Sequence, residues 1–171
     1  MKGRLKIVLV FTLLFNSSAR LLAQDYQTHW PAFKIGRTDA SYYGGEDLQP
    51  RSKVLFVYFL PDCDDCQHFT TKLLEQRNRL QGFRVIMITN TPLQPLRAFE
   101  TKYHLKQYPG IVAGTEGSTF VFQRAFHIQQ FPFAVLYANG RQLKTFSGDA
   151  IGMVQQIVDA VDKNQSRSKT P

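Results

Sequence analysis

An uninterrupted apolar and aromatic run, residues 54–60 (VLFVYFL), constrains the fold of this 171-residue chain more than any other feature. A strand with one face in water alternates polar and apolar residues, so this run predicts a strand covered on both faces. Pro61 and Asp62 end the run, and the apolar spacing that follows predicts a helix from Cys63 to about residue 80. A buried strand that passes directly into a helix is typical of α/β folds.

The rest of the chain alternates between strand and helix patterns. Strands are predicted at residues 83–89, 111–113, 133–138 and 142–146, and helices at residues 96–103, 118–126 and 151–161. Asn139-Gly140 predicts a hairpin turn, which makes the last two strands antiparallel, whereas helical crossovers imply parallel strands. The predicted fold class is therefore α/β, with a mixed central β-sheet flanked by helices in one domain.

Residues 24–53 form the start of that domain. Their turn signals predict a hairpin or an irregular lead-in, and residues 46–48 are expected to open a short helix with Asp47 as its cap. The domain is predicted to span residues 24–162. Residues 163–171 are polar and are expected to form a flexible tail.

The N-terminus has the three-part layout of a secretory signal peptide: a basic start, the apolar residues 7–15, and small polar residues after them. Cleavage fits after Ala19 or after Ala23, and we prefer Ala23. The alternative is an uncleaved membrane anchor, but a bilayer span needs about 20 apolar residues and this run is much shorter. We therefore expect residues 1–23 to be removed and the mature protein to be periplasmic.

The formal net charge of +8 is concentrated at the two ends of the chain. Of the 21 Lys and Arg residues, four lie in the first twenty positions and three in the last nine. The central part is therefore close to neutral, and the basic composition does not argue for a nucleic-acid partner.

The two cysteines, Cys63 and Cys66, lie where the buried strand gives way to the helix. Two intervening residues on a first helical turn bring the sulfurs close enough to form a disulfide. The helix N-terminus supplies free amide donors and a partial positive charge that stabilise a Cys63 thiolate. This placement predicts a redox pair in which Cys63 is the exposed nucleophile and Cys66 the deeper resolving thiol. The pair is its own redox centre, so no diffusible cofactor is expected.

Other uses of the two cysteines remain open at this point. A structural disulfide is one, although so short a loop constrains the unfolded chain little, and the chain would then be a non-catalytic interaction module. Structural zinc normally needs four ligands, and the chain's four histidines are scattered. A copper carrier would use the reduced cysteine pair with one histidine. We expect no bound metal.

The chain resembles the thioredoxin-like superfamily, most closely its exported TlpA/ResA-like branch of thiol–disulfide oxidoreductases, which is related to the redoxins and of a Bacteroidetes type. The resemblance rests on residues 31–33, Leu48, residues 53–66, residues 99–103, residues 126–128, Phe131-Pro132, Asn139-Gly140 and residues 146–148.

This resemblance implies a thioredoxin-like fold with an extra strand and helix inserted before Pro132. It implies that the Phe131–Pro132 bond is cis and faces the cysteines, with the Phe131 backbone available to an extended client segment. The implied partners are client proteins with thiols or disulfides and a membrane-bound thiol as electron donor. The protein itself is expected to be a monomer.

The sequence also departs from the superfamily around the cysteines. Asp62 replaces the usual tryptophan, Val57 replaces a buried acid, and Phe69 replaces a glutamate common in the branch. The proton acceptor for Cys66 is thus unassigned. The nearby candidates for tuning the redox pair are Asp62, Asp64, Asp65 and His68.

Asp64 and Asp65 lie between the two cysteines. The negative charges of their carboxylates destabilise a neighbouring thiolate, and this favours the disulfide over the reduced pair. The two aspartates therefore predict a reductant or relay rather than a strong oxidant. The competing interpretation is that both are solvated residues that chiefly stabilise the start of the helix.

Overall fold

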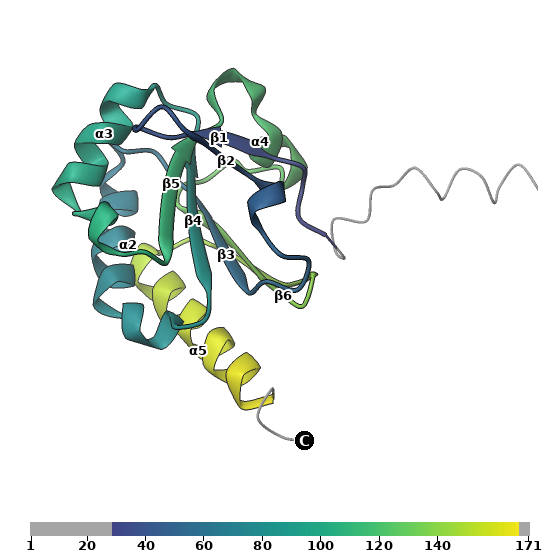
Figure 1. Ribbon diagram of the computed structural model, residues 1–171. Helices are drawn as coiled ribbons and strands as arrows, with labels where there is room; N and C mark the ends of the chain where they lie inside the picture. The colour runs from purple at the N-terminus through teal and green to yellow at the C-terminus, as the bar shows by residue number, and fades with distance from the viewer. Residues whose placement is uncertain (1–28, 168–171) are drawn as a thin grey trace, which may run out of the picture.

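The computed structural model describes residues 29–167, so the predicted signal peptide lies outside the described residues. These residues form a seven-stranded sheet in the order β2-β1-β5-β4-β3-β6-β7 (Figure 1). The strands are β1 (Lys34–Gly36), β2 (Tyr42–Gly44), β3 (Val54–Tyr58), β4 (Arg84–Thr89), β5 (Ile111–Thr115), β6 (Phe133–Ala138) and β7 (Arg141–Ser147). The central β3, β4 and β5 are parallel, and the outer strands pair antiparallel, which confirms the predicted mixed sheet.

Helices cover both faces of this sheet. The α-helices are α2 (Asp64–Glu75), α3 (Leu93–Lys102), α4 (Val121–Ala125) and α5 (Ala150–Arg167), and the 3-10 turns are η2 (Gly45–Asp47), η3 (Arg77–Leu80), η4 (Leu105–Gln107) and η5 (Gly117–Thr119). One core contains the buried residues of α2, α3 and α5, which lie together on one side of the sheet in Figure 1. A second core contains residues of the N-terminal segment and α4.

Strand β3 lies between these two cores, and all five of its residues are buried. Leu55 and Val57 point into the core of α2, α3 and α5, whereas Phe56 and Tyr58 point into the second core. Burial on both faces is the property that the apolar run at residues 54–60 predicts.

The second core is rich in aromatic rings. Trp30, the one tryptophan of the chain, packs against Phe56 and Tyr137 at ring-centroid distances of 6.3 and 6.0 Å. Phe56 also packs against Phe122 of α4 at 4.8 Å. The N-terminal segment and α4 are thus fixed to the same face of the sheet.

The predicted lead-in is a hairpin, β1 paired with β2. Its short helix is η2, one residue earlier than expected, and Asp47 is its third residue rather than its cap. The Asp47 carboxylate accepts a hydrogen bond from the backbone amide of Gly44 at 2.8 Å. Asp47 therefore reaches back from the third position of η2 to Gly44, the N-cap residue.

The predicted helices have different bounds in the structure. The helix that begins after Cys63 ends at Glu75, and η3 continues it as a tighter turn to Leu80. Helix α3 begins at Leu93, because Pro95 fits within a first turn, where no amide partner is needed. The helix expected at residues 118–126 is split, since Phe120 has the left-handed φ of 47°.

Helix α5 continues to Arg167, past the predicted end at residue 161. Tertiary contacts hold this extension. Asp162 forms an ion pair with Arg79, and the Gln165 side chain donates to the carbonyl oxygens of Arg79 and Gln81 at 3.4 and 3.2 Å.

The Asn139-Gly140 turn joins β6 and β7 as predicted, with φ values of 56° and 75° that suit these two residues. The expected insertion before Pro132 is also present, as β5 and α4. Over residues 29–167, every helix is too short or too polar to cross a bilayer.

Candidate redox site

The Cys63 sulfur lies at the N-terminus of α2, just beyond the carboxyl end of β3. A turn presents it: the Cys63 amide donates to the Leu60 carbonyl oxygen at 3.2 Å. Cys63 is the helix N-cap, and its sulfur accepts a hydrogen bond from the Cys66 backbone amide at 3.2 Å. The sulfur therefore occupies the position of the side-chain oxygen in an ordinary N-cap, where free amides and the helix dipole favour negative charge.

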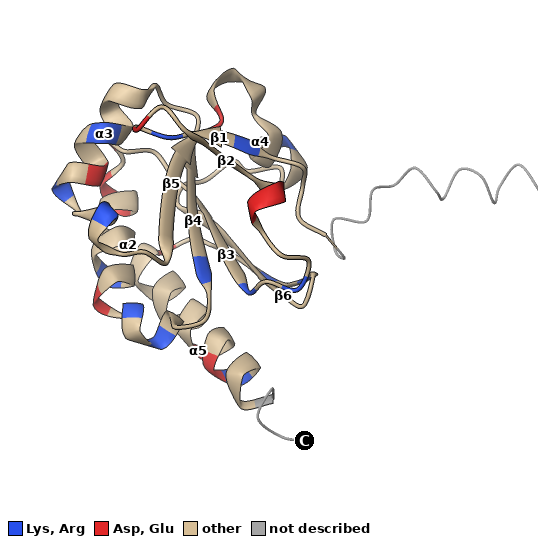
Figure 2. Ribbon diagram, viewed as in Figure 1, with Lys and Arg blue, Asp and Glu red and all other residues tan. Residues whose placement is uncertain are grey.

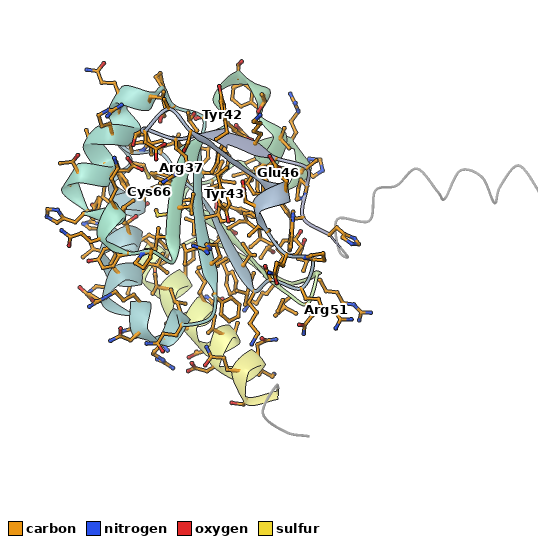
Figure 3. All side chains as sticks on the ribbon, in the orientation of Figure 1. Arg37, Tyr42, Tyr43, Glu46, Arg51 and Cys66 are labelled. Carbon is orange, nitrogen blue, oxygen red and sulfur yellow. The ribbon has the colours of Figure 1, made fainter. Side chains whose placement is uncertain are left out.

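The two thiols are unequal in exposure. Both are free, Cys63 is half-buried, and Cys66 has 0% of its surface exposed. Figure 3 shows Cys66 on the side of the molecule that holds α2 and α3, away from Arg51, which extends from the opposite edge. Burial raises the pKa of the Cys66 thiol well above its usual 9.0, and the neighbouring Cys63 and Asp65 act in the same direction. Cys66 is thus protonated at neutral pH.

The four residues predicted to tune the pair, Asp62, Asp64, Asp65 and His68, are all exposed. Asp64 and Asp65 lie in the first turn of α2. Within residues 29–167, none of the three aspartates forms an ion pair with Lys, Arg or His. Of the four, Asp65 is the one whose charge acts on Cys66.

The Phe131–Pro132 peptide bond is cis, as the resemblance implies. Phe133 pairs with Tyr58 in the antiparallel register of β6 and β3, so Pro132 lies beside the chain as it leaves β3 toward Cys63. The half-buried Phe131 ring stacks on Tyr58 at 5.8 Å and packs against both cores. The structure therefore places the proline loop at the same end of the sheet as the cysteines.

Gln67, the residue after Cys66, is a member of this site for which the sequence gives no signal. Its side-chain amide donates to the Pro61 carbonyl oxygen at 3.0 Å and accepts from the Lys102 ammonium at 2.6 Å. Its backbone carbonyl oxygen accepts from the Tyr103 hydroxyl at 3.3 Å. Gln67 thus connects the turn before Cys63 to the end of α3.

A second unpredicted feature is a buried carboxylate that is hydrogen-bonded to the last residue of β3. Glu116 is 4% exposed, and its two oxygens accept hydrogen bonds from the Tyr58 hydroxyl at 2.7 Å and the Phe122 amide at 2.9 Å. The only signal in the sequence is the hydroxyl of Tyr58, which needs a partner inside an apolar run.

One cavity lies away from the cysteines. It has a volume of about 560 Å³, and its lining includes the residues just before β3, β4 and β5, which are Lys53, Phe83 and Gly110. These are the amino ends of the parallel strands, whereas Cys63 follows a carboxyl end. The part of the chain that the structure describes contains no group of three or more His, Cys, Asp or Glu side chains placed to share a metal ion.

The sequence matches no protein-family model and no curated protein. Solved structures do match its fold. A secreted Mycobacterium tuberculosis disulfide oxidoreductase homologous to E. coli DsbE is 14% identical, with a TM-score of 0.63 over 81% of this chain and 98% of that one. A putative thioredoxin from Neisseria meningitidis is 24% identical, with a TM-score of 0.62 over 82% of this chain and 93% of that one.

An Arabidopsis thaliana ScoI structure with copper bound is also similar, at 13% identity and a TM-score of 0.57 over 80% of this chain and 99% of that one. Identities this low establish the architecture and not the activity. The chain has the thioredoxin-like fold.

Proposed function

We propose that this protein is an exported thiol–disulfide oxidoreductase that exchanges disulfides with client proteins through Cys63 and Cys66. The observation that carries the proposal is the asymmetry of the pair. The Cys63 sulfur caps a helix and accepts the Cys66 amide, while Cys66 is fully buried one turn later. A nucleophile in an anion-stabilising position and a protected second thiol are the two parts that exchange requires.

In the reductive direction, the Cys63 thiolate attacks one sulfur of a client disulfide. The client S–S bond breaks, a mixed disulfide forms with Cys63, and the other client sulfur leaves as a thiolate that takes a proton from water. Cys66 then gives up its proton to water and attacks the Cys63 sulfur as a thiolate, and the departing client sulfur takes a proton from water and leaves as the second client thiol. The client gains two electrons, and the Cys63–Cys66 pair becomes a disulfide.

The acidic residues favour a reductant or relay over a strong oxidant. Asp64 and Asp65 are exposed in the first turn of α2, and neither is paired with a cation among residues 29–167. Unneutralised carboxylates beside a thiolate destabilise the reduced form and lower the reduction potential. Figure 2 shows basic and acidic residues interspersed over the helices around this site.

The proposed function includes a location outside the cytoplasm and two kinds of protein partner. Residues 1–23 serve as a cleaved signal peptide, and the mature protein works in the periplasm. Its clients are proteins with exposed disulfides or thiols, and a membrane-bound thiol protein returns electrons to the pair. The Phe131–Pro132 loop, at the same end of the sheet as Cys63, forms the docking surface for the client chain.

Trapping tests the exchange reaction. In a Cys66→Ala variant the mixed disulfide cannot be resolved, so client proteins should accumulate on Cys63 and be released by dithiothreitol. The control is the Cys63→Ser/Cys66→Ala variant, which should trap nothing. A Cys66→Ala protein that traps no client and a wild-type protein that fails to reduce insulin would together overturn the proposal. Tight, stoichiometric copper binding lost in Cys63→Ser would then favour the copper carrier.

The direction of exchange is tested by equilibrium with glutathione. The reductant assignment predicts a reduction potential well below about −120 mV, the value of the strong oxidant DsbA. A potential near that value would contradict it.

A further inference from the structure

The turn that presents Cys63 is held at its centre by a residue outside the redox motif. Residues 60–63 form this turn, which the Cys63 amide closes by donating to Leu60. The Gln67 side chain reaches back and donates to the carbonyl oxygen of Pro61 at 3.0 Å. The Gln67 backbone amide also donates to the Cys63 carbonyl oxygen at 3.0 Å, so the same residue contacts the turn and the helix cap.

The other contacts of Gln67 lead to α3. The Lys102 ammonium donates to the Gln67 side-chain oxygen at 2.6 Å, and the Tyr103 hydroxyl donates to its backbone oxygen. Tyr103 in turn packs on Phe99 at 4.6 Å, and Phe99 packs on Phe59 at 4.7 Å. The end of α3 is therefore fixed to the core, and it gives Gln67 a rigid support.

The side-chain amide group of Gln67 lies between Lys102 and the turn. A cation on the amide oxygen polarises the group, which makes its N–H a stronger donor to the Pro61 carbonyl oxygen. Lys102 needs no contact with Cys63 to act in this way. Gln67 is half-buried, so its hydrogen bonds are shielded in part from water.

We propose that Gln67 is a positioning residue of the redox pair, and that Lys102 acts on Cys63 through it. The proposal rests on the proposed exchange function. By fixing the turn of residues 60–63, Gln67 keeps the Cys63 sulfur on the Cys66 amide, where its anionic form is stabilised. Without Gln67 the sulfur leaves this position more often, and both the reactivity and the redox equilibrium of the pair change.

Alkylation by iodoacetamide measures the Cys63 sulfur directly. In a full-length Cys66→Ala host, which has a single thiol, Gln67→Ala should slow alkylation at pH 7 about threefold to tenfold, the effect of losing one hydrogen bond. In the two-cysteine protein, Gln67→Ala should shift the glutathione equilibrium toward the disulfide by a similar factor. Gln76→Ala is the matched control: it is a half-buried glutamine at the other end of α2, and both quantities should stay within about twofold.

A double-variant cycle tests the route from Lys102. Lys102→Met alone should slow alkylation, and adding it to Gln67→Ala should have no further effect. Additive effects would mean that Lys102 acts on the sulfur as a direct charge, and would overturn the proposed route. A Gln67→Ala protein that melts earlier but keeps the alkylation rate and glutathione equilibrium would overturn the positioning role. Neither measurement requires a client protein, so failure here is distinguishable from failure to trap one.

Discussion

The Tyr58 hydroxyl donates a 2.7 Å hydrogen bond to Glu116, and both side chains are buried. Tyr58 is the last residue of β3, and Glu116 directly follows β5, two strands away in the sheet. The Phe131 ring stacks on the ring of Tyr58. This hydrogen bond therefore ties the inserted segment to the strand that leads to Cys63 and to the loop that contains Pro132.

Removing the Tyr58 hydroxyl should destabilise the protein. Tyr58→Phe leaves one buried oxygen of Glu116 without its donor, which should lower the free energy of unfolding by about 1–3 kcal/mol. Urea unfolding followed by circular dichroism measures this. Tyr42→Phe removes a hydroxyl from a side chain that is 66% exposed and should change stability by less than about 0.5 kcal/mol. An equal loss of unfolding free energy in Tyr58→Phe and Tyr42→Phe would contradict a stabilising role of the Tyr58–Glu116 hydrogen bond.

The reduced protein should lose stability at alkaline pH. Burial raises the pKa of the Cys66 thiol above its usual 9.0, and burial raises the pKa of Tyr58 and Tyr137 above 10.0. The folded state then holds protons that the unfolded chain releases, so the contribution of these three groups to stability is constant below about pH 9 and falls above it. The slope reaches about 1.4 kcal/mol per pH unit for each group.

Unfolding at a series of pH values, with a non-thiol reductant present, measures this loss. Cys66→Ala should remove the part of the decline that begins near pH 9 and leave the steeper part above pH 10. An unchanged onset in Cys66→Ala would show that another group is responsible.

Gly114 allows the hairpin to pack closely on β5. A Cβ atom at this position would lie 2.7 Å from Cγ1 and 2.9 Å from Cβ of Ile35, which is fully buried. Gly114→Ala should therefore cost about 1–3 kcal/mol of unfolding free energy. Ile35→Ala should destabilise the Gly114→Ala variant less than it destabilises the parent protein. The methyl group added at position 114 occupies part of the space that the Ile35 side chain leaves.

The matched control for this change is Gly110→Ala. Gly110 lies just before the same strand, and the nearest atom to an added Cβ is the Phe83 carbonyl oxygen at 3.9 Å. The free energy of unfolding of the Gly110→Ala variant should be close to that of the parent protein. A similar loss in both variants would indicate a general cost of replacing glycine rather than a clash with Ile35.

The β1–β2 hairpin should depend on a hydrogen bond to α3. Thr38 is 4% exposed, its hydroxyl donates to the buried Glu100, and its carbonyl oxygen accepts from Arg97 at 2.7 Å. Thr38→Val keeps the shape but removes the donor, and should lower the free energy of unfolding by about 1–3 kcal/mol.

Thr101→Val is the control for that substitution, because Thr101 is exposed on the same helix and water can replace its hydrogen bond. Hydrogen exchange should also accelerate at the amides of β1 in Thr38→Val. Unchanged exchange there would contradict the anchoring role of this contact.

The sequence predicted the parts of the fold that local patterns determine. The run at residues 54–60 identified the strand between the two cores, and the cysteines that follow it marked the candidate site. The Asn139-Gly140 turn and the cis Phe131–Pro132 bond were also predicted, the second only through resemblance. Each depends on residues that are neighbours in the chain.

The features that were missed depend on contacts between distant residues. Glu116 contacts Tyr58 across 58 positions, and Gln67 contacts Lys102 across 35. The end of α5 depends on Gln165, which reaches Arg79 across 86 positions. No local pattern distinguishes these polar residues from solvated ones, so a single sequence cannot show which of them are held in place.

The position of Trp30 separates the optical signal of folding from the redox state of the cysteine pair. Its ring packs with Phe56 and Tyr137 in the second core, whereas Cys66 belongs to the core on the other face of the sheet. Intrinsic tryptophan emission should therefore follow unfolding while remaining nearly silent to oxidation of the cysteine pair. The molecule thus contains, in Trp30, an optical probe of conformation that does not report the redox state of the cysteine pair.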